Sequence, residues 1–89
     1  MLMPGMLNET QMNELTSARG QEFDRLFLTY MIQHHQGAIS MVKDLLSSRG
    51  AGMDETVFKM ASDINVDQET EVRRMQTMLY NLLIAKPSY

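Results

Sequence analysis

The only two histidines of the chain, His34 and His35, are adjacent, and methionines lie close to them at Met31 and Met41. Imidazole nitrogen binds copper, zinc, iron and nickel, whereas thioether sulfur is a soft ligand that favours copper, mainly Cu(I). At about 100° per residue of a helix, His34 and Met41 fall about 60° and 80° to one side of Met31, and His35 falls about 40° to the other. Four potential copper ligands therefore share one face of a single predicted helix.

Neighbouring histidines point about 100° apart on a helix, so both cannot easily bind one ion from one chain. They would serve two ions, or one would bind metal while the other hydrogen-bonds across to a second helix, or a dimer would bring four imidazoles together. The main alternative is structural, because histidines on apolar faces are more often hydrogen-bonded core residues. An enzyme is the last-ranked alternative, since the sequence offers no nucleophile–base pair and no phosphate-binding loop, and it would be a metal-dependent one that turns over a peroxide or another redox substrate.

Apolar residues at helical spacing predict the elements that position these groups. Asn8 is a suitable N-cap for a short helix over about 9–18, with Gln11 placed to complete a capping box. The apolar pattern then predicts a long helix over about 21–48 that contains both histidines. Gly37 lies inside this helix, where its missing side chain would let another backbone or a ligand come close.

A second long helix is predicted over about 55–84, after a glycine-rich turn. No sustained alternation of apolar and polar residues predicts a strand, so the fold class is all-α, and two long helices joined by a short turn must pack antiparallel. We expect a linker over 1–7, a single helical domain over 8–86 and a tail over 87–89. The apolar stripe expected to face the first long helix is Val57, Met60, Ala61, Ile64, Gln68, Glu71, Met75, Met78, Leu79 and Leu82.

Polar residues interrupt this stripe at the height of the histidines. In a hairpin centred near residue 51, residues whose numbers sum to about 102 lie level with each other. A metal-bound histidine usually donates its other N–H to a carboxylate or carbonyl. Three polar residues are therefore expected to orient the imidazoles or to hydrogen-bond them in a metal-free core: Asp67, Gln68 and Glu71.

The composition limits the possible functions. The chain has 89 residues, a net charge of −3, ten methionines and no cysteine, which excludes disulfides and thiolate metal sites. Its eight basic residues are scattered and argue against a nucleic-acid partner, and no apolar run reaches the roughly 20 residues of a membrane span. The first six residues lack the basic and apolar regions of a signal peptide, so we expect a mature or truncated piece.

These residues resemble the domain-of-unknown-function 305 family over nearly the whole chain, from Gly5-Met6 to about Leu82. The phrases that carry the resemblance are Phe-Asp followed by Met-Ile-x-His-His-x-Gly-Ala and Met, and then Gln-x-x-Glu-x-x-x-Met. The resemblance implies a ferritin-like helical bundle, usually in the periplasm or at the cell surface, and some relatives bind copper through methionine and histidine and serve copper tolerance. Many members carry two copies of the unit. A single copy is expected to need a homodimer or a second unit to complete a four-helix bundle.

The residues favour copper over iron. A carboxylate-bridged di-iron bundle needs Glu-x-x-His on two of its helices, whereas here Met31 stands three residues before His34 and no glutamate follows Glu22 on that helix. We therefore expect a non-enzymatic copper-binding domain, with zinc or iron less favoured. The expected metal ligands are Met31, His34, His35 and Met41. The residues that the family pattern and the hairpin register add, as orienting groups or alternative ligands, are Asp24, Asp67, Gln68, Glu71 and Met75.

Overall fold

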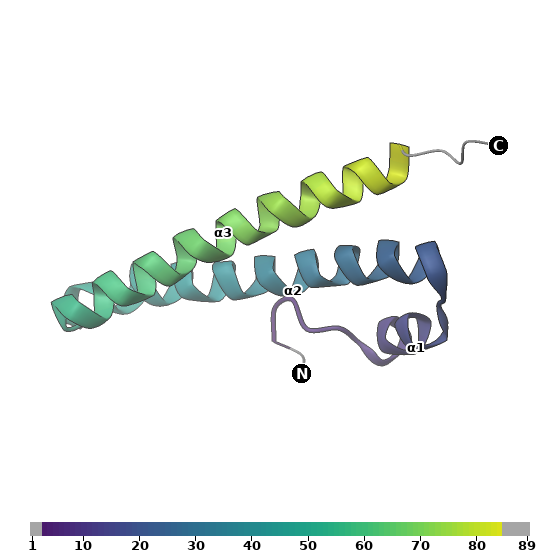
Figure 1. Cartoon of the computed structure of the whole chain (residues 1–89). Coiled ribbons are helices and arrows are strands. Elements are labelled where there is room, and N and C mark those ends of the chain that lie inside the picture. Colours follow the sequence, from purple (N-terminus) through teal and green to yellow (C-terminus); the bar gives the residue numbers. More distant parts are fainter. Residues whose placement is uncertain (1–2, 85–89) are drawn as a thin grey trace.

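The structure is a computed structural model that describes residues 3–84, apart from the side chain of Ala51. It contains α1 (Glu9–Ser17), α2 (Gly20–Arg49), a 3₁₀ turn (Gly50–Gly52) and α3 (Glu55–Ile84), and no strand within the described range. Figure 1 shows α2 and α3 as an antiparallel hairpin, with α1 on the opposite side of α2 from α3. The predicted all-α fold is confirmed. Residues 1–2 of the predicted linker, residues 85–86 of the predicted domain and the predicted 87–89 tail lie outside the described residues.

The helix starts follow from local hydrogen bonds. The Asn8 side chain accepts a bond from the Gln11 backbone N–H at 2.8 Å, and the Gln11 side chain accepts one from the Asn8 N–H at 3.0 Å, which is the predicted capping box. At α3, the Asp54 carboxylate accepts from the backbone N–H of Thr56 at 2.8 Å. Between α1 and α2 the chain reverses at Gly20, whose φ of 61° lies in the left-handed region that glycine adopts without strain.

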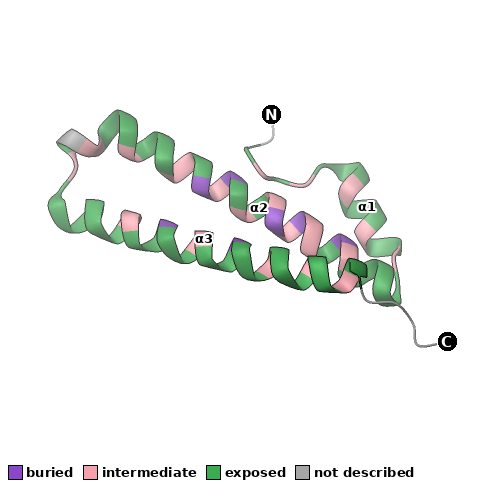
Figure 2. Ribbon diagram, turned by 90° about the horizontal axis from the view of Figure 1, so that it is seen from above, coloured by how far each residue is buried: buried purple, intermediate pink, exposed green. Residues whose placement is uncertain are grey.

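The three helices form a single layer. The molecule measures 58 × 30 × 14 Å, so its smallest dimension is close to the diameter of one helix, about 10–12 Å with side chains. Figure 2 shows buried residues only in narrow seams between the elements, and no described side chain is less than 2% exposed. Because stable domains usually consist of at least two packed layers, both broad faces of this layer lack the cover that a core normally has.

The core of the hairpin is small and central. Ile32 and Ile39 of α2 meet Val72 of α3, and Met75 and Leu79 pack against this cluster. These two isoleucines are seven residues apart and therefore lie on nearly the same side of α2. This side, and not the side that carries Met31 and His34, faces α3.

The predicted inner stripe of α3 is correct at Met75 and Leu79, which pack against the cluster, but the helix is rotated about its axis relative to the prediction. Met60, Ile64 and Met78 were expected to face α2, but they are exposed, while Val72 and Asn65 occupy the buried positions. Both α2 and α3 carry two apolar stripes. Periodicity alone does not show which stripe of each helix meets the other.

The opposite side of α2 is covered by α1 and by the segment that precedes it. Tyr30 lies about 180° around the helix from Ile39 and is buried, as is Leu26. Burial, together with the neighbouring carboxylate of Glu14 on α1, raises the pKa of the Tyr30 hydroxyl. Packing on two opposite sides of α2 leaves its two remaining sides on the broad faces of the layer.

Candidate metal site

The N-terminal segment crosses α2 at Gly37, one turn after the histidines. A Cβ at Gly37 would lie 2.2 Å from the carbonyl oxygen of Pro4, and a Cβ at Gly5 would lie 2.9 Å from the carbonyl oxygen of His34. Two glycines therefore allow two backbones to touch, and the φ of 84° at Gly5 also requires glycine. The close approach predicted at Gly37 is confirmed, and the approaching group is the backbone of Pro4 and Gly5.

A glutamine holds this segment in place. The Gln33 side chain donates a hydrogen bond to the backbone carbonyl of Met6 at 3.3 Å and accepts one from the Gln11 side chain at 2.9 Å. Gln11 also closes the capping box of α1. The residue directly before His34 therefore links α2, the N-terminal segment and the first turn of α1.

The side of α2 that neither α3 nor the N-terminal segment covers carries the predicted ligands. Gly37 and Ile39 lie about 200° apart on the helix, so their partners contact nearly opposite sides. On the side between them His34 is exposed, and Met31 and Met41 are half-buried. This surface, named the His34 face, consists of Phe23, Phe27, Met31, His34, Ala38, Met41 and Leu45.

The two histidines have different surroundings. His34 is exposed, whereas His35 is half-buried at the edge of the face that packs on α3. The Nδ1 atom of His35 lies 2.8 Å from the carbonyl oxygen of Met31. Because a carbonyl oxygen only accepts, this Nδ1 carries a proton, and the lone pair of the neutral ring lies on Nε2. A backbone carbonyl, instead of the expected carboxylate, thus orients His35.

The His34 face continues onto α3. Phe27 and Met78 line a common groove of about 400 Å³ together with Asp24, Leu28 and Leu82. Seven residues of a helix rise about 10.5 Å and return to nearly the same side, with a rotation of only about 20°. Moving seven residues forward from Phe27 on α2 and seven residues back from Met78 on α3 therefore gives another pair at one height on the same broad side. Three layers result: the phenylalanine layer (Phe27 and Met78), the histidine layer (His34 and Glu71) and the methionine layer (Met41 and Ile64).

The structure distributes the other predicted residues over different environments. Asp67 is exposed, and Gln68 is half-buried. Met75 packs against the core cluster, which makes it a core residue in this chain. Glu71 is exposed, and its carboxylate lies 3.7 Å from Arg74, one turn further along α3. Of the polar residues expected opposite the histidines, only Glu71 shares a layer and a broad face with His34.

Asn65 is a polar residue whose burial was not predicted from the sequence. It is 6% exposed on the inner side of α3, and its side-chain oxygen has no hydrogen-bond partner. Asn65 stands seven residues before Val72, and residues seven apart lie on nearly the same side of a helix. The spacing therefore predicts that Asn65 is buried only once Val72 is known to face α2.

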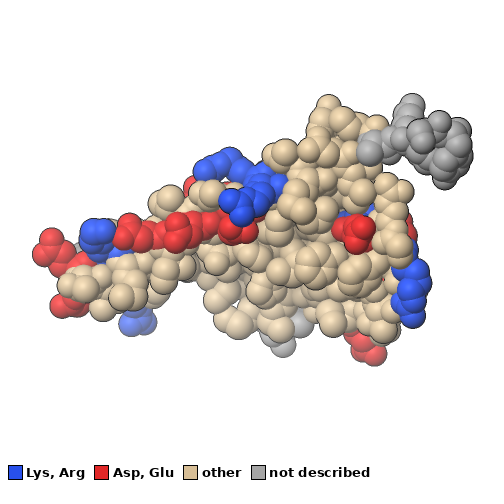
Figure 3. Space-filling model, in the orientation of Figure 1, with Lys and Arg blue, Asp and Glu red and all other residues tan. Residues whose placement is uncertain are grey.

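Charged groups gather elsewhere on α3. Figure 3 shows acidic side chains in a row along the half of α3 nearest the turn. Asp63, Asp67 and Glu71 follow one another at four-residue spacing and are exposed. Lys59 pairs with Asp63 at 2.8 Å, so part of this charge is compensated. The row ends at Glu71, in the histidine layer.

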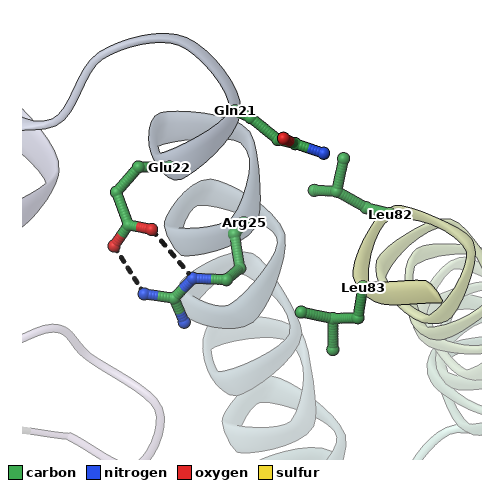
Figure 4. Close-up of a pocket in the computed structure, with 5 residues that line it drawn as sticks. All are labelled: Gln21, Glu22, Arg25, Leu82 and Leu83. Atoms are coloured by element: carbon green, nitrogen blue, oxygen red, sulfur yellow. Dashed lines mark hydrogen bonds and ion pairs between the residues drawn. The ribbon is translucent and has the colours of Figure 1, made fainter. Parts of the chain in front are cut away.

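A hollow at the open end of the hairpin is less suited to binding. Figure 4 shows Leu82 and Leu83 of α3 facing α2 there, while the Arg25 side chain turns to Glu22. The carboxylate accepts from Nη2 and Nε of Arg25 at 2.5 and 3.1 Å, and this bonding lowers the pKa of Glu22. The arginine is thus already paired.

Within residues 3–84, no three histidine or carboxylate side chains converge in a way that could hold a metal ion. A site within one chain would therefore need methionine sulfur or a backbone group in addition to imidazole. None of the described helices combines the length and apolar character that crossing a bilayer requires.

The geometry defines a class of protein, a single-layer antiparallel helical hairpin with methionine and histidine on one broad face. The chain belongs to the family described as Domain of unknown function (DUF305), whose model matches residues 1–79. This match confirms the resemblance noted in the sequence and includes the N-terminal segment, both histidines and all three layers. No curated protein and no solved structure matches the chain.

Proposed function

We propose that this protein is a non-enzymatic copper-binding module that serves copper tolerance or homeostasis, in the periplasm or at the cell surface. The ligands are the two histidines and the two methionines of the His34 face and its edge, Met31, His34, His35 and Met41. The observation that carries the proposal is the 2.8 Å contact between Nδ1 of His35 and the Met31 carbonyl oxygen. It supports a ring whose Nε2 is unprotonated and oriented before a metal binds.

The ligand types support copper over the alternatives. Thioether sulfur is a soft donor that stabilises Cu(I), and zinc and iron sites in proteins draw mainly on imidazole, thiolate and carboxylate. Met31 and Met41 flank His34 along the same side of α2, at distances of about 4.5 and 10.5 Å along the helix axis. When bound, the ion would be held by neutral imidazole and thioether groups, which suits a buffering or delivery role.

The exposed carboxylates of α3 support an approach of cations. Asp67 and Glu71 lie on the side of α3 next to the His34 face, and the acidic row continues toward the turn. With a net charge of −3, the chain as a whole also attracts cations weakly. Because these charges are solvent-exposed, we expect them to raise the rate of metal binding, and we expect this effect to decrease as the salt concentration rises.

A competition titration tests the proposal. Cu(I) is titrated against a chelator of known affinity, alongside Cu(II), Zn(II) and Fe(II), with the wild-type protein and with the His34→Ala/His35→Ala double variant. We expect Cu(I) binding tighter than about micromolar in the wild type, stronger than binding of Zn(II) and Fe(II), and its loss in the double variant.

The matched control is the Gln36→Ala/Ser40→Ala double variant. Both residues are exposed on the other broad side of α2, so this variant should bind copper as the wild type does. Wild-type binding no tighter than about micromolar for all four ions would contradict the proposal. Equal affinity of the two double variants for Cu(I) would remove the histidines from the site.

The exposed apolar residues of the His34 face favour a second candidate, a dimerisation module whose histidines bind no metal. Phe27 is 43% exposed and Met78 is 51% exposed in the same groove. The two candidates agree that a second copy of the hairpin completes a four-helix bundle. Copper uptake that depends on the histidines separates them.

A further inference from the structure

The three layers, which join the His34 face of α2 to the adjoining side of α3, form a self-complementary surface. Its ends are apolar and its centre, the histidine layer, is polar. The centre pairs a ring that can donate a hydrogen bond with a carboxylate that can only accept. A surface of this kind matches a rotated copy of itself, which is the requirement for a two-fold symmetric dimer.

The size of the surface fits such a dimer. Two helices of about 45 Å lying roughly 9 Å apart present on the order of 800 Å², which is close to what each partner buries in an interface of standard size. The layer is only 14 Å thick, and Ile64, the tenth residue of α3, is 49% exposed. Exposed apolar residues gathered at both ends of one face of a small domain are typical of an interaction site.

We propose that a second copy of this chain covers the His34 face, with each layer lying on its own counterpart and α2 of one copy over α3 of the other. The proposal rests on the proposed function, because it assigns Glu71 of the second copy to His34. In this bundle every helix has antiparallel neighbours. The Glu71 carboxylate accepts a hydrogen bond from the N–H of the facing imidazole and orients its other nitrogen toward the metal.

The electrostatics favour this orientation over its reverse. If α2 lay over α2 of the second copy, the histidine layer would place His34 on His34 and Glu71 on Glu71. Like charges that face each other across an interface are unfavourable. Placing α2 over α3 instead sets each imidazole against a carboxylate.

The molar mass in solution tests the interface, measured by light scattering without metal. We expect twice the mass of one chain for the wild type and a shift toward one chain for Phe27→Ser, whose helix content is checked by circular dichroism. Tyr80→Ser is the matched control, because Tyr80 is 62% exposed and lies about 200° around α3 from Met78. A wild-type protein with the mass of one chain would overturn the interface.

Engineered cysteines test the orientation, since the chain has none of its own. A mixture of Phe27→Cys and Met78→Cys chains should form a covalent mixed dimer under mild oxidation, because these residues share a layer. A mixture of Ile64→Cys and Met78→Cys chains should not, because the two layers lie about 21 Å apart. The opposite outcome would overturn the orientation.

Copper affinity tests the assignment of Glu71. Glu71→Gln should lower the affinity for Cu(I) about tenfold, the usual cost of losing an orienting partner of a metal ligand. Glu69→Gln should leave the affinity unchanged, because Glu69 lies 3.8 Å from Lys43 on the other broad face. If the wild type binds copper and Glu71→Gln binds it equally well, the assignment is wrong and the proposed function stands. If the wild type binds none, the proposed function and the assignment both fail, while the mass still decides the interface.

Discussion

The imidazole rings of His34 and His35 lie 6.1 Å apart, with their planes at 67°. One ring is exposed on a broad face of the layer, and the other is half-buried and hydrogen-bonded to the backbone of its own helix. The two histidine side chains should therefore contribute differently to the stability of the fold. Copper binding and folding stability should therefore separate when the two are substituted one at a time.

Single substitutions should show this separation in the apo protein. His35→Ala should lower the free energy of unfolding by about 1 kcal/mol, because it removes a hydrogen bond and half-buried contacts. His34→Ala should change it by less than about 0.5 kcal/mol, as is usual for an exposed side chain. Urea denaturation followed by circular dichroism measures both, with Gln36→Ala as the exposed reference. Equal losses at the two positions would contradict the distinction.

Copper affinity should fall steadily as the pH decreases from about 7 to about 5. A protonated imidazole cannot bind a metal ion, so protons compete with copper for each histidine ligand. The competition titration repeated at several pH values measures this, with a chelator whose own pH dependence is known. Thioether sulfur takes up no proton in this range, so an affinity that stays constant would point to a site of methionines alone.

Gly37→Ala should separate the N-terminal segment from α2. The added methyl group would lie 2.2 Å from the Pro4 carbonyl oxygen, and overpacking of this kind typically costs about 1–3 kcal/mol. We expect a lower midpoint of thermal unfolding and faster proteolysis before Asn8. Gly52→Ala is the control, because nothing lies within 4 Å of a Cβ at that position. If both variants unfold and are cleaved like the wild type, the backbone contact does not contribute to stability.

Asn65→Leu should stabilise the protein. The side-chain oxygen of Asn65 is buried without a partner, a situation that costs about 1–3 kcal/mol, and leucine has a similar size without a polar atom. A gain of about 1 kcal/mol in the free energy of unfolding is expected by urea denaturation. Asn81→Leu at an exposed position of the same helix shows the effect of the residue change alone. A loss of stability at position 65 would mean that the amide has a role in the native state.

The elements could be predicted because their signals are local. Capping residues, glycines and a helical apolar period determine where each helix starts and stops, and no end of a predicted helix differs from the observed one by more than one residue. The contact at Gly37 was also predicted, since a glycine costs a helix interior about 1 kcal/mol relative to alanine and leaves room for another backbone. These features depend on neighbours within a turn or two of the chain.

The rotation of the helices could not be predicted in the same way. Ile32 and Ile39 on one side of α2, and Phe27 and Met41 on another, are equally regular apolar stripes. Which of them faces α3 depends on the summed packing of the whole hairpin. The candidate ligands were found by their chemistry, whereas their placement on an uncovered face required the structure.

The position of the small core also shapes how the hairpin opens. The cluster of Ile32, Ile39 and Val72 lies near the middle of both long helices, and the turn ties one end covalently. At the far end the hollow between the helices is lined by half-buried Leu82 and exposed Leu83. Local unfolding should therefore begin at that far end and stop at the cluster. Backbone amides next to the cluster should exchange their hydrogens most slowly, with protection fading along α3 toward Ile84.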